Sequence, residues 1–139
     1  MDVLRRNTDY GMRMMVILAE YYSDGQLISA RQLTNGAHFS YMLGSKILQK
    51  LHNKGLLNSG MGPKGGFILS KPPSEITLMD VVEALQGNVK LNRCLVDDKG
   101  CEFQSTCEIN TKLSCLQLYI DGYLDGITLT EIVGAKEKC

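Results

Sequence analysis

Apolar side chains recur every three or four residues in several stretches of the chain, which is the spacing of one face of an α-helix. The first stretch, residues 8–22, carries the stripe Tyr10, Met14, Ile17 and Tyr21. Thr8 is placed to cap the start of this helix, and Gly25 lies just past its end. Because methionine-rich stripes of this kind are typical of packing, we predict a core helix here rather than a ligand site.

The next stretch predicts two helices joined by a tight turn. Ser29 and Gln32 form a capping-box pattern, so a short helix should begin there and break near Gly36. Ser40 can cap a second helix that runs to about Lys54. The expected buried stripe of the second helix is Leu43, Ile47, Leu48 and Leu51, and its expected exposed side is Tyr41, Ser45, Lys46, Gln49, Lys50, Asn53 and Lys54. A lysine row of this kind suits either a solvated face or contact with nucleic acid.

A glycine-rich β-hairpin is expected next. Residues 56–59 and 67–70 are strand-like and flank a tip at residues 60–66. Gly65 and Gly66 would permit positive φ in that tip. One helix, two helices joined by a turn and then a hairpin is the order of a winged helix, which reads DNA with its second turn helix and its wing. A simple connecting hairpin is the alternative.

The remaining sequence predicts two further helices. One runs from about Leu78 to Gln86, and the other extends for about 20 residues. The apolar seam of the longer helix is Ile109, Leu113, Leu116, Ile120 and Tyr123. Such a seam can pack within its own domain, but a long helix beside a DNA-binding module favours a homodimer. The expected fold class is mainly α with a small β-wing, a winged helix-turn-helix over residues 1–75 followed by a long C-terminal dimerisation helix.

Charge is distributed unevenly, although the formal net charge is zero. Residues 1–71 hold nine Lys/Arg and four Asp/Glu, whereas the rest of the chain holds six and eleven. A basic half joined to an acidic half indicates that only the first half meets a polyanion. No apolar run approaches the roughly 20 residues needed to cross a bilayer, and the N-terminus lacks a signal-peptide pattern. We therefore expect a cytoplasmic protein with no membrane partner.

Three of the five cysteines, Cys94, Cys101 and Cys107, lie in one loop between the last two predicted helices. In a reducing compartment a disulfide framework is not expected, which favours metal or redox use. The spacing lacks the Cys-x-x-Cys pair of structural zinc sites and the tight runs of ferredoxins. An iron-sulfur site, zinc, a redox switch and unrelated thiols all stay open on spacing alone. No histidine or acid is placed to activate one thiol, so we expect neither an enzyme nor a small-molecule substrate.

Three segments together resemble the Rrf family of winged-helix transcriptional regulators. They are the opening motif TDYGMR, the wing motif GLLNSGMGPKGGFIL, and ITLMDVVEALQG followed by the three loop cysteines. The resemblance covers about residues 1–133. It implies a homodimeric repressor that binds double-stranded DNA and whose DNA affinity follows redox state, nitric oxide or iron-sulfur status. A cluster-free regulator of the CymR kind, controlled by a partner protein or by cysteine oxidation, is the alternative.

The resemblance also implies a ligand set for a 4Fe-4S or 2Fe-2S cluster. Cys94, Cys101 and Cys107 match the three cysteine ligands, which makes residues 76–139 the cluster-binding loop and dimerisation helix. Members of the IscR kind place a histidine three residues after the last cysteine, where this chain has Asn110. Members of the NsrR kind use an aspartate from the opening helix of the partner subunit, and Asp9 stands at that position. Otherwise Asp9 would serve only the dipole of its own helix.

The predicted DNA-binding residues are Arg31, Ser40, Tyr41, Ser45, Lys46, Gln49, Lys50 and Lys64. Lys46 and Lys50 would mainly bind phosphate, whereas the uncharged side chains of the same helix would reach base edges. Met61 stands where the family has a wing arginine, so Lys64 supplies the charge of the wing without the planar fork of a guanidinium.

Overall fold

The computed structural model describes residues 2–96, 101–103 and 105–135. Part of the predicted cysteine loop, residues 97–100 and 104, lies outside these ranges, as does Cys139. The elements are α1 (Arg6–Glu20), α2 (Ala30–Gly36), α3 (Tyr41–Asn53), β1 (Leu57–Gly60), β2 (Gly66–Leu69), α4 (Leu78–Gln86), α5 (Glu108–Gly126) and α6 (Leu129–Ile132), with short 3₁₀ helices at Tyr22–Asp24, Pro73–Glu75 and Arg93–Leu95. Within the described ranges, no helix is long and apolar enough to span a bilayer.

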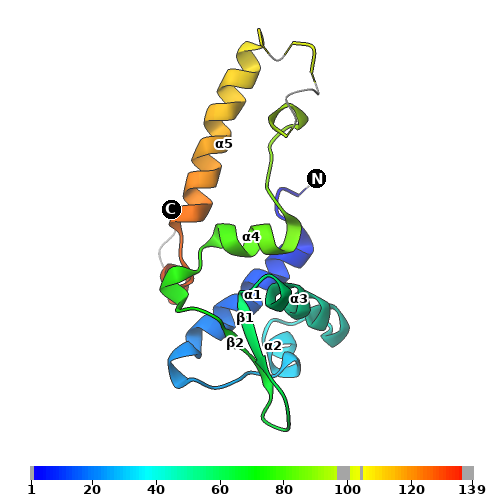
Figure 1. Cartoon of the computed structure of the whole chain (residues 1–139), viewed down its shortest axis with the longest axis vertical. Helices are drawn as coiled ribbons and strands as arrows, with labels where there is room; N and C mark the ends of the chain where they lie inside the picture. The colour runs from blue at the N-terminus through cyan, green and yellow to red at the C-terminus, as the bar shows by residue number, and fades with distance from the viewer. Residues whose placement is uncertain (1, 97–100, 104, 136–139) are drawn as a thin grey trace.

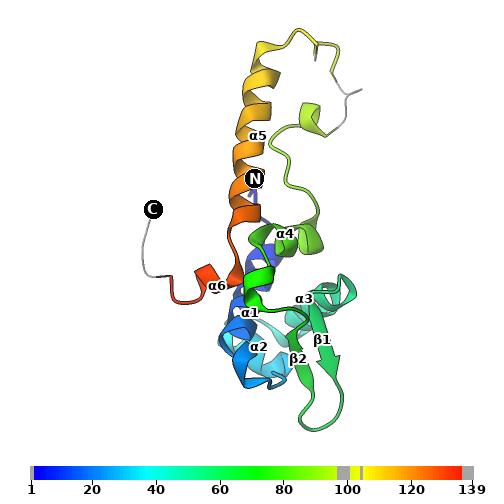
Figure 2. The same ribbon diagram turned by 60° about the vertical axis from the view of Figure 1, so that its left-hand side comes forward.

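The molecule consists of a body and a projecting arm. Figures 1 and 2 show α1–α4, α6 and the hairpin gathered together, while α5 extends away with the cysteine segment beside it. The two strands are antiparallel, with Leu57 opposite Leu69 and Gly60 opposite Gly66. The predicted class, mainly α with a small β-wing, is confirmed.

The core lies where α1, α3 and α4 meet. Met14 and Met15 of α1, Leu48 of α3 and Val81 of α4 are fully buried in it. Leu129 of α6 is buried in the same core, so residues on both sides of position 75 contribute to it. The domain division at that position stays a prediction from the sequence.

The methionines of α1 are buried in the core as predicted, but two other predictions for this helix were wrong. The helix begins at Arg6, and Thr8 is not its cap. The buried hydroxyl of Thr8 instead donates to Oε1 of Gln86 at 2.6 Å, which ties α1 to the end of α4. Tyr21 is 50% exposed, because the helix ends at Glu20 and the chain turns away before the predicted stripe is complete.

The two helices on either side of the α2–α3 turn have the N-terminal caps predicted from the sequence. Ser29 and Gln32 form the expected capping box, and Ser40 caps α3. The two helices approach so closely that a Cβ at Gly44 would collide with the methyl group of Thr34 and lie 3.0 Å from Phe39 Cε2. The hydroxyl of Thr34 donates to Ala30 O at 2.9 Å, which holds that methyl group in place.

The wing is fastened to the segment before α2. Ile28 and Phe67 exchange both backbone hydrogen bonds, at 3.0 and 2.8 Å. A Cβ at Gly66 would collide with Ile28 O, so this glycine is required by close approach as well as by its φ of 156°. The other positive φ of the tip is at Gly62 (99°) and not at Gly65, where the sequence predicted it.

The different surroundings of Gly44 and Gly122 predict opposite effects of alanine on the free energy of unfolding. Alanine is the better helix former by about 1 kcal/mol, so Gly122→Ala in α5, where a Cβ would meet no atom within 4 Å, should raise the free energy of unfolding. Gly44→Ala should lower it by about 1–3 kcal/mol, because the new methyl group overpacks the turn. Denaturant unfolding of the two variants checks this, and a stabilised Gly44→Ala protein would contradict the packing described.

Candidate functional site

The exposed side of α3 is the first candidate surface. Met42, Lys46 and Gln49 follow one another there at helical spacing, and all three are exposed. The amide of Gln49 donates to Asn53 Oδ1 at 3.0 Å, one turn further on. This face therefore offers an apolar contact, a cation and an amide, the groups with which proteins read a DNA groove. Sequence reasoning missed Met42, although its spacing of four from Lys46 carried the signal.

The starts of α2 and α3 come together beside this face. The guanidinium of Arg31 lies over the ring of Tyr41, 5.2 Å from its centroid, and joins the two helices by a cation–π contact. Ser40 is exposed and accepts the N–H of Leu43 at 3.4 Å. Arg31, Ser40 and Tyr41 thus lie together at one end of the α3 surface.

Two other predicted DNA-binding residues have different surroundings. The Lys50 ammonium donates to Leu85 O in the last turn of α4 at 2.7 Å, so it joins α3 to α4. The Ser45 hydroxyl is buried, with no hydrogen-bond partner among the described residues. Lys50 is an exposed residue like Lys46, but its ammonium is directed to α4, whereas the Ser45 hydroxyl is out of contact with solvent.

The wing tip faces the start of α2. Lys64 is exposed, and an open hollow of about 750 Å³ between the tip and α2 is lined by Lys64, Pro63, Ser29 and Gln32 among others. On the far strand, Ser59 Oγ lies 3.3 Å from Nε2 of His52, which connects β1 to the end of α3. The wing and α3 are therefore held in one framework.

The three loop cysteines line one hollow at the start of α5. It has a volume of about 360 Å³ and is lined by Asn92, Arg93, Cys94, Cys101, Cys107, Ile109, Asn110 and Leu113. All three thiols belong to half-buried residues. Cys107 is the N-cap of α5, and its Sγ accepts the backbone N–H of Asn110 at 3.4 Å. The structure brings the three predicted cysteine ligands to one place.

The described residues of the hollow do not form a complete ligand set. Among the described residues, no three His, Cys, Asp or Glu side chains are arranged as a metal site. Asp9 does not line the hollow and forms an ion pair with Arg13 one turn along α1, at 3.1 Å. Cys115 is exposed on α5 and does not line the hollow.

Gln117 fastens the segment before the cysteines to α5. Its side chain is buried, and its Nε2 donates to Val89 O at 2.7 Å while its Oε1 accepts Leu91 N–H at 3.0 Å. The same Nε2 donates to Asp121 Oδ1 at 2.8 Å. Sequence reasoning missed this residue, and the only available signal was a glutamine interrupting the apolar face of a long helix.

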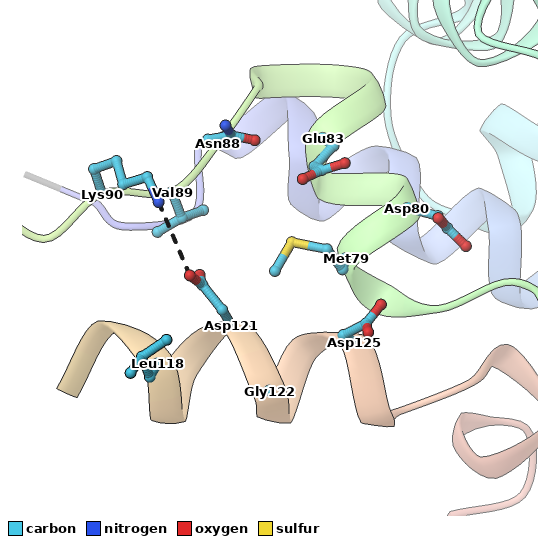
Figure 3. A pocket seen from close by; sticks show the side chains of 10 residues that line it. All are labelled: Met79, Asp80, Glu83, Asn88, Val89, Lys90, Leu118, Asp121, Gly122 and Asp125. Atoms are coloured by element: carbon cyan, nitrogen blue, oxygen red, sulfur yellow. Dashed lines mark ion pairs between the residues drawn. The ribbon is translucent and has the colours of Figure 1, made fainter. Parts of the chain in front are cut away.

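An acidic hollow separates this part of the molecule from the basic half. Figure 3 shows the space between α4 and α5, about 550 Å³, with Asp80, Glu83, Asp121 and Asp125 among its lining residues. Lys90 faces Asp121 across the hollow at 3.9 Å. Four carboxylates against one ammonium make this hollow unfavourable for a polyanion.

α5 carries a large apolar surface in this chain. Tyr119 is 78% exposed, and Ile109, Leu116 and Tyr123 on the same side of the helix are exposed as well, whereas Leu118 lies on the other side and lines the acidic hollow. The helix packs on α4 and on the 3₁₀ helix Arg93–Leu95, which leaves these side chains uncovered. Apolar surface of this extent on one helix marks an interaction face.

Comparison with known proteins gives consistent matches. A family model named Rrf2 and described as "Iron-dependent Transcriptional regulator" matches residues 4–135. The HTH-type transcriptional regulator IscR of Serratia proteamaculans is 32% identical over 132 residues, covering 92% of this chain and 77% of that protein. An HTH-type transcriptional regulator of Aquifex aeolicus is 31% identical over 96 residues, which cover 68% of this chain and 67% of that protein.

Solved structures share the fold at lower sequence identity. CymR, described as the global cysteine regulator of B. subtilis, superposes with a TM-score of 0.80 at 21% identity, covering 99% of this chain and 100% of that one. T. potens IscR gives a TM-score of 0.76 at 22% identity, and the superposition covers 96% of this chain and 87% of that one. These relatives are regulators by name rather than enzymes. The chain therefore belongs to the Rrf2 family of DNA-binding transcriptional regulators.

Proposed function

We propose that this regulator is a homodimeric repressor whose affinity for double-stranded DNA is controlled by an iron-sulfur cluster. Cys94, Cys101 and Cys107 would bind the cluster, and the partner subunit's Asp9 would complete the ligand set. The observation that carries the proposal is the shared hollow of the three cysteines at the start of α5. The IscR relatives support the same cofactor by sequence.

The chemistry of the hollow fits such a cluster. Thiolates are the ligands that iron-sulfur centres take in proteins, and three are present on one short segment. When bound, the cluster supplies iron–thiolate bonds and a centre that responds to redox state, nitric oxide or iron supply. The carboxylate of Asp9 lies on the first turn of α1, outside its own chain's hollow, which suits a ligand donated across a dimer.

The exposed apolar face of α5 supports the dimer. Ile109 and Tyr119, on the same side of the helix, are among the most exposed large side chains of the described residues. A second copy of the same helix would bury this face and bring two α3 surfaces to two DNA half-sites about one helical turn apart.

The hydrogen bonds of this chain supply a route from the cysteines to the DNA-binding side. Gln117 fixes the chain at Val89 and Leu91, just ahead of Cys94. That segment directly follows α4, whose last turn accepts the Lys50 ammonium of α3. Tightening or releasing the cysteine segment would thus bias the position of α3. A bias of about 1.4 kcal/mol toward the DNA-competent state changes binding tenfold.

A cluster-free regulator is the second candidate. The superposition on CymR favours it, as does the incomplete ligand set among the described residues of the single chain. Control would then come from oxidation of the loop thiols or from a partner protein, with the same DNA-binding surface.

Metal analysis separates the two candidates. Protein purified without oxygen should be coloured and contain iron and sulfide, and Cys101→Ala should lose most of both because one of three thiolate ligands is missing. Cys115→Ala is the matched control, since this thiol is exposed outside the hollow, and it should load like the wild type. Colourless, iron-free wild-type protein would favour the cluster-free candidate.

The assignment of Asp9 is tested against its ion-pair partner. Asp9→Ala should shorten the lifetime of the cluster in air, whereas Arg13→Ala should preserve it, since both remove the same ion pair and only the first removes the carboxylate. The decay of visible absorbance measures this. Equal lifetimes in Asp9→Ala and wild type would exclude Asp9 as a ligand.

Two lysines of α3 should differ in their salt dependence. Lys46→Ala should reduce the slope of log K against log salt by about 0.9, the value for one phosphate contact. Lys50→Ala should leave the slope unchanged, because its ammonium is bound to Leu85 O. Titrations of a duplex selected from a random pool measure both slopes. If only Lys50→Ala reduced the slope, Lys50 and not Lys46 would be the residue that contacts phosphate.

A further inference from the structure

An apolar groove lies between α1, the α2–α3 turn, the start of α4 and α6. It has a volume of about 470 Å³, and its apolar lining includes Met12, Val16, Ile17, Leu78 and Ile132, all of them half-buried in the single chain. Of the described residues that line it, Arg13 carries a full charge and none is acidic. A concave, mostly apolar surface with a few polar groups is typical of a binding site.

The groove lies on the side of α1 that carries Asp9. Met12, Arg13 and Val16 follow Asp9 at spacings of three, four and seven residues, so all four share one face of the helix. Arg13 lines the groove and also forms the 3.1 Å ion pair with Asp9. About one helical turn, roughly 5.4 Å, separates the two residues along the helix. A partner subunit that reaches Asp9 therefore also reaches the edge of the groove.

Phe103 is the side chain of the cysteine segment that suits this groove. It is 69% exposed in its own chain, and its backbone oxygen accepts the N–H of Thr106 at 3.1 Å. Phe103 follows Cys101, which lines the hollow of the three cysteines, by two positions. Two residues span at most about 7 Å, which is more than the single turn between Asp9 and Arg13. Aromatic side chains are enriched in protein interfaces, where they fill pockets of the partner.

We propose that Phe103 of the partner subunit docks in the apolar groove beside Asp9. The inference rests on the homodimer proposed above, in which Asp9 of one subunit meets the three cysteines of the other, and it assigns Phe103 no bond to iron. An aromatic ring matches the groove, because the ring is apolar and its face attracts a cation such as the Arg13 guanidinium. In a two-fold dimer each subunit fills the groove of the other.

The docked ring would contact the turn that leads into α3. Ala37 and His38 of this turn line the groove, and Ile17 Cδ1 lies 3.1 Å from the position that a Cβ at Gly36 would take. His38 has a φ of 60°, the one positive value outside glycine among the described residues, and its surroundings must hold it in that uncommon conformation. Phe103 thus joins the cysteine segment of one subunit to the turn that positions α3 in the other.

Photo-crosslinking tests this contact in the full chain, purified without oxygen. The photoreactive phenylalanine analogue p-benzoylphenylalanine replaces Phe103 in one variant. In a second variant it replaces Tyr119 on the exposed face of α5, which is the matched control for dimer formation. Both variants should give crosslinked dimers. Mass spectrometry should place the crosslink from position 103 within residues 12–17 or 36–38 of the partner chain, and the crosslink from position 119 within α5 of the partner chain.

A truncation measures the contribution of the ring to the dimer. Phe103→Ala should raise the dissociation constant of the dimer about tenfold, which is the scale for an aromatic anchor of an interface. Val96→Ala is the matched control, since Val96 is 68% exposed on the same segment and does not line the hollow of the cysteines. It should change the dissociation constant by less than about twofold, as peripheral contacts do. Sedimentation equilibrium measures both.

Two results would overturn the inference while the dimer stands. One is a normal crosslink from position 119 with none from position 103, or with one outside the groove. The other is a Phe103→Ala protein with the dimer dissociation constant of wild type. Wild-type protein that sediments as a monomer, with no crosslink from either position, would remove the proposed dimer and this inference together. Iron analysis of the wild type tests the cluster separately.

Discussion

The buried side chain of Gln117 is the contact on which the arrangement of the cysteine segment depends. The chain between α4 and the cysteines has no strand partner, so its backbone groups need acceptors and donors from elsewhere. Gln117 provides both, to Val89 and Leu91, from the middle of α5. One side chain thus determines where the segment runs along the helix, and with it the position of the hollow that the cysteines share.

The last turn of α4 connects this segment to α3 and α1, on the proposed DNA-binding side. Leu85 O accepts Lys50 of α3, and Gln86 accepts the hydroxyl of Thr8 and the N–H of Arg5 at the start of α1. A single hydrogen bond of this kind contributes about 0.5–1.5 kcal/mol, which is the scale of a tenfold change in DNA affinity. The proposed regulation therefore needs only a small rearrangement at this end of α4.

Local features of the fold were predictable from the sequence, and features that depend on distant residues were not. The capping box of Ser29 and Gln32 lies within four residues, so it could be read directly. Thr8 has the chemistry of a cap, but Gln86 competes for its hydroxyl from 78 residues away. Periodicity likewise put Lys50 on the exposed side of α3, and only the tertiary structure supplies Leu85 O as its partner.

The candidate site also has one part that the local sequence predicts and one part that depends on tertiary contacts. The three cysteines could be identified from their clustering, while the role of Gln117 depends on the packing of α5 against the segment that follows α4. The central claim is that the state of the cysteine hollow sets DNA affinity. Its most direct test is the dissociation constant of one anaerobic preparation for a selected duplex, measured before and after removal of iron with a chelator. The account predicts a change of about tenfold or more, and equal affinities of the iron-loaded and iron-free forms would contradict it.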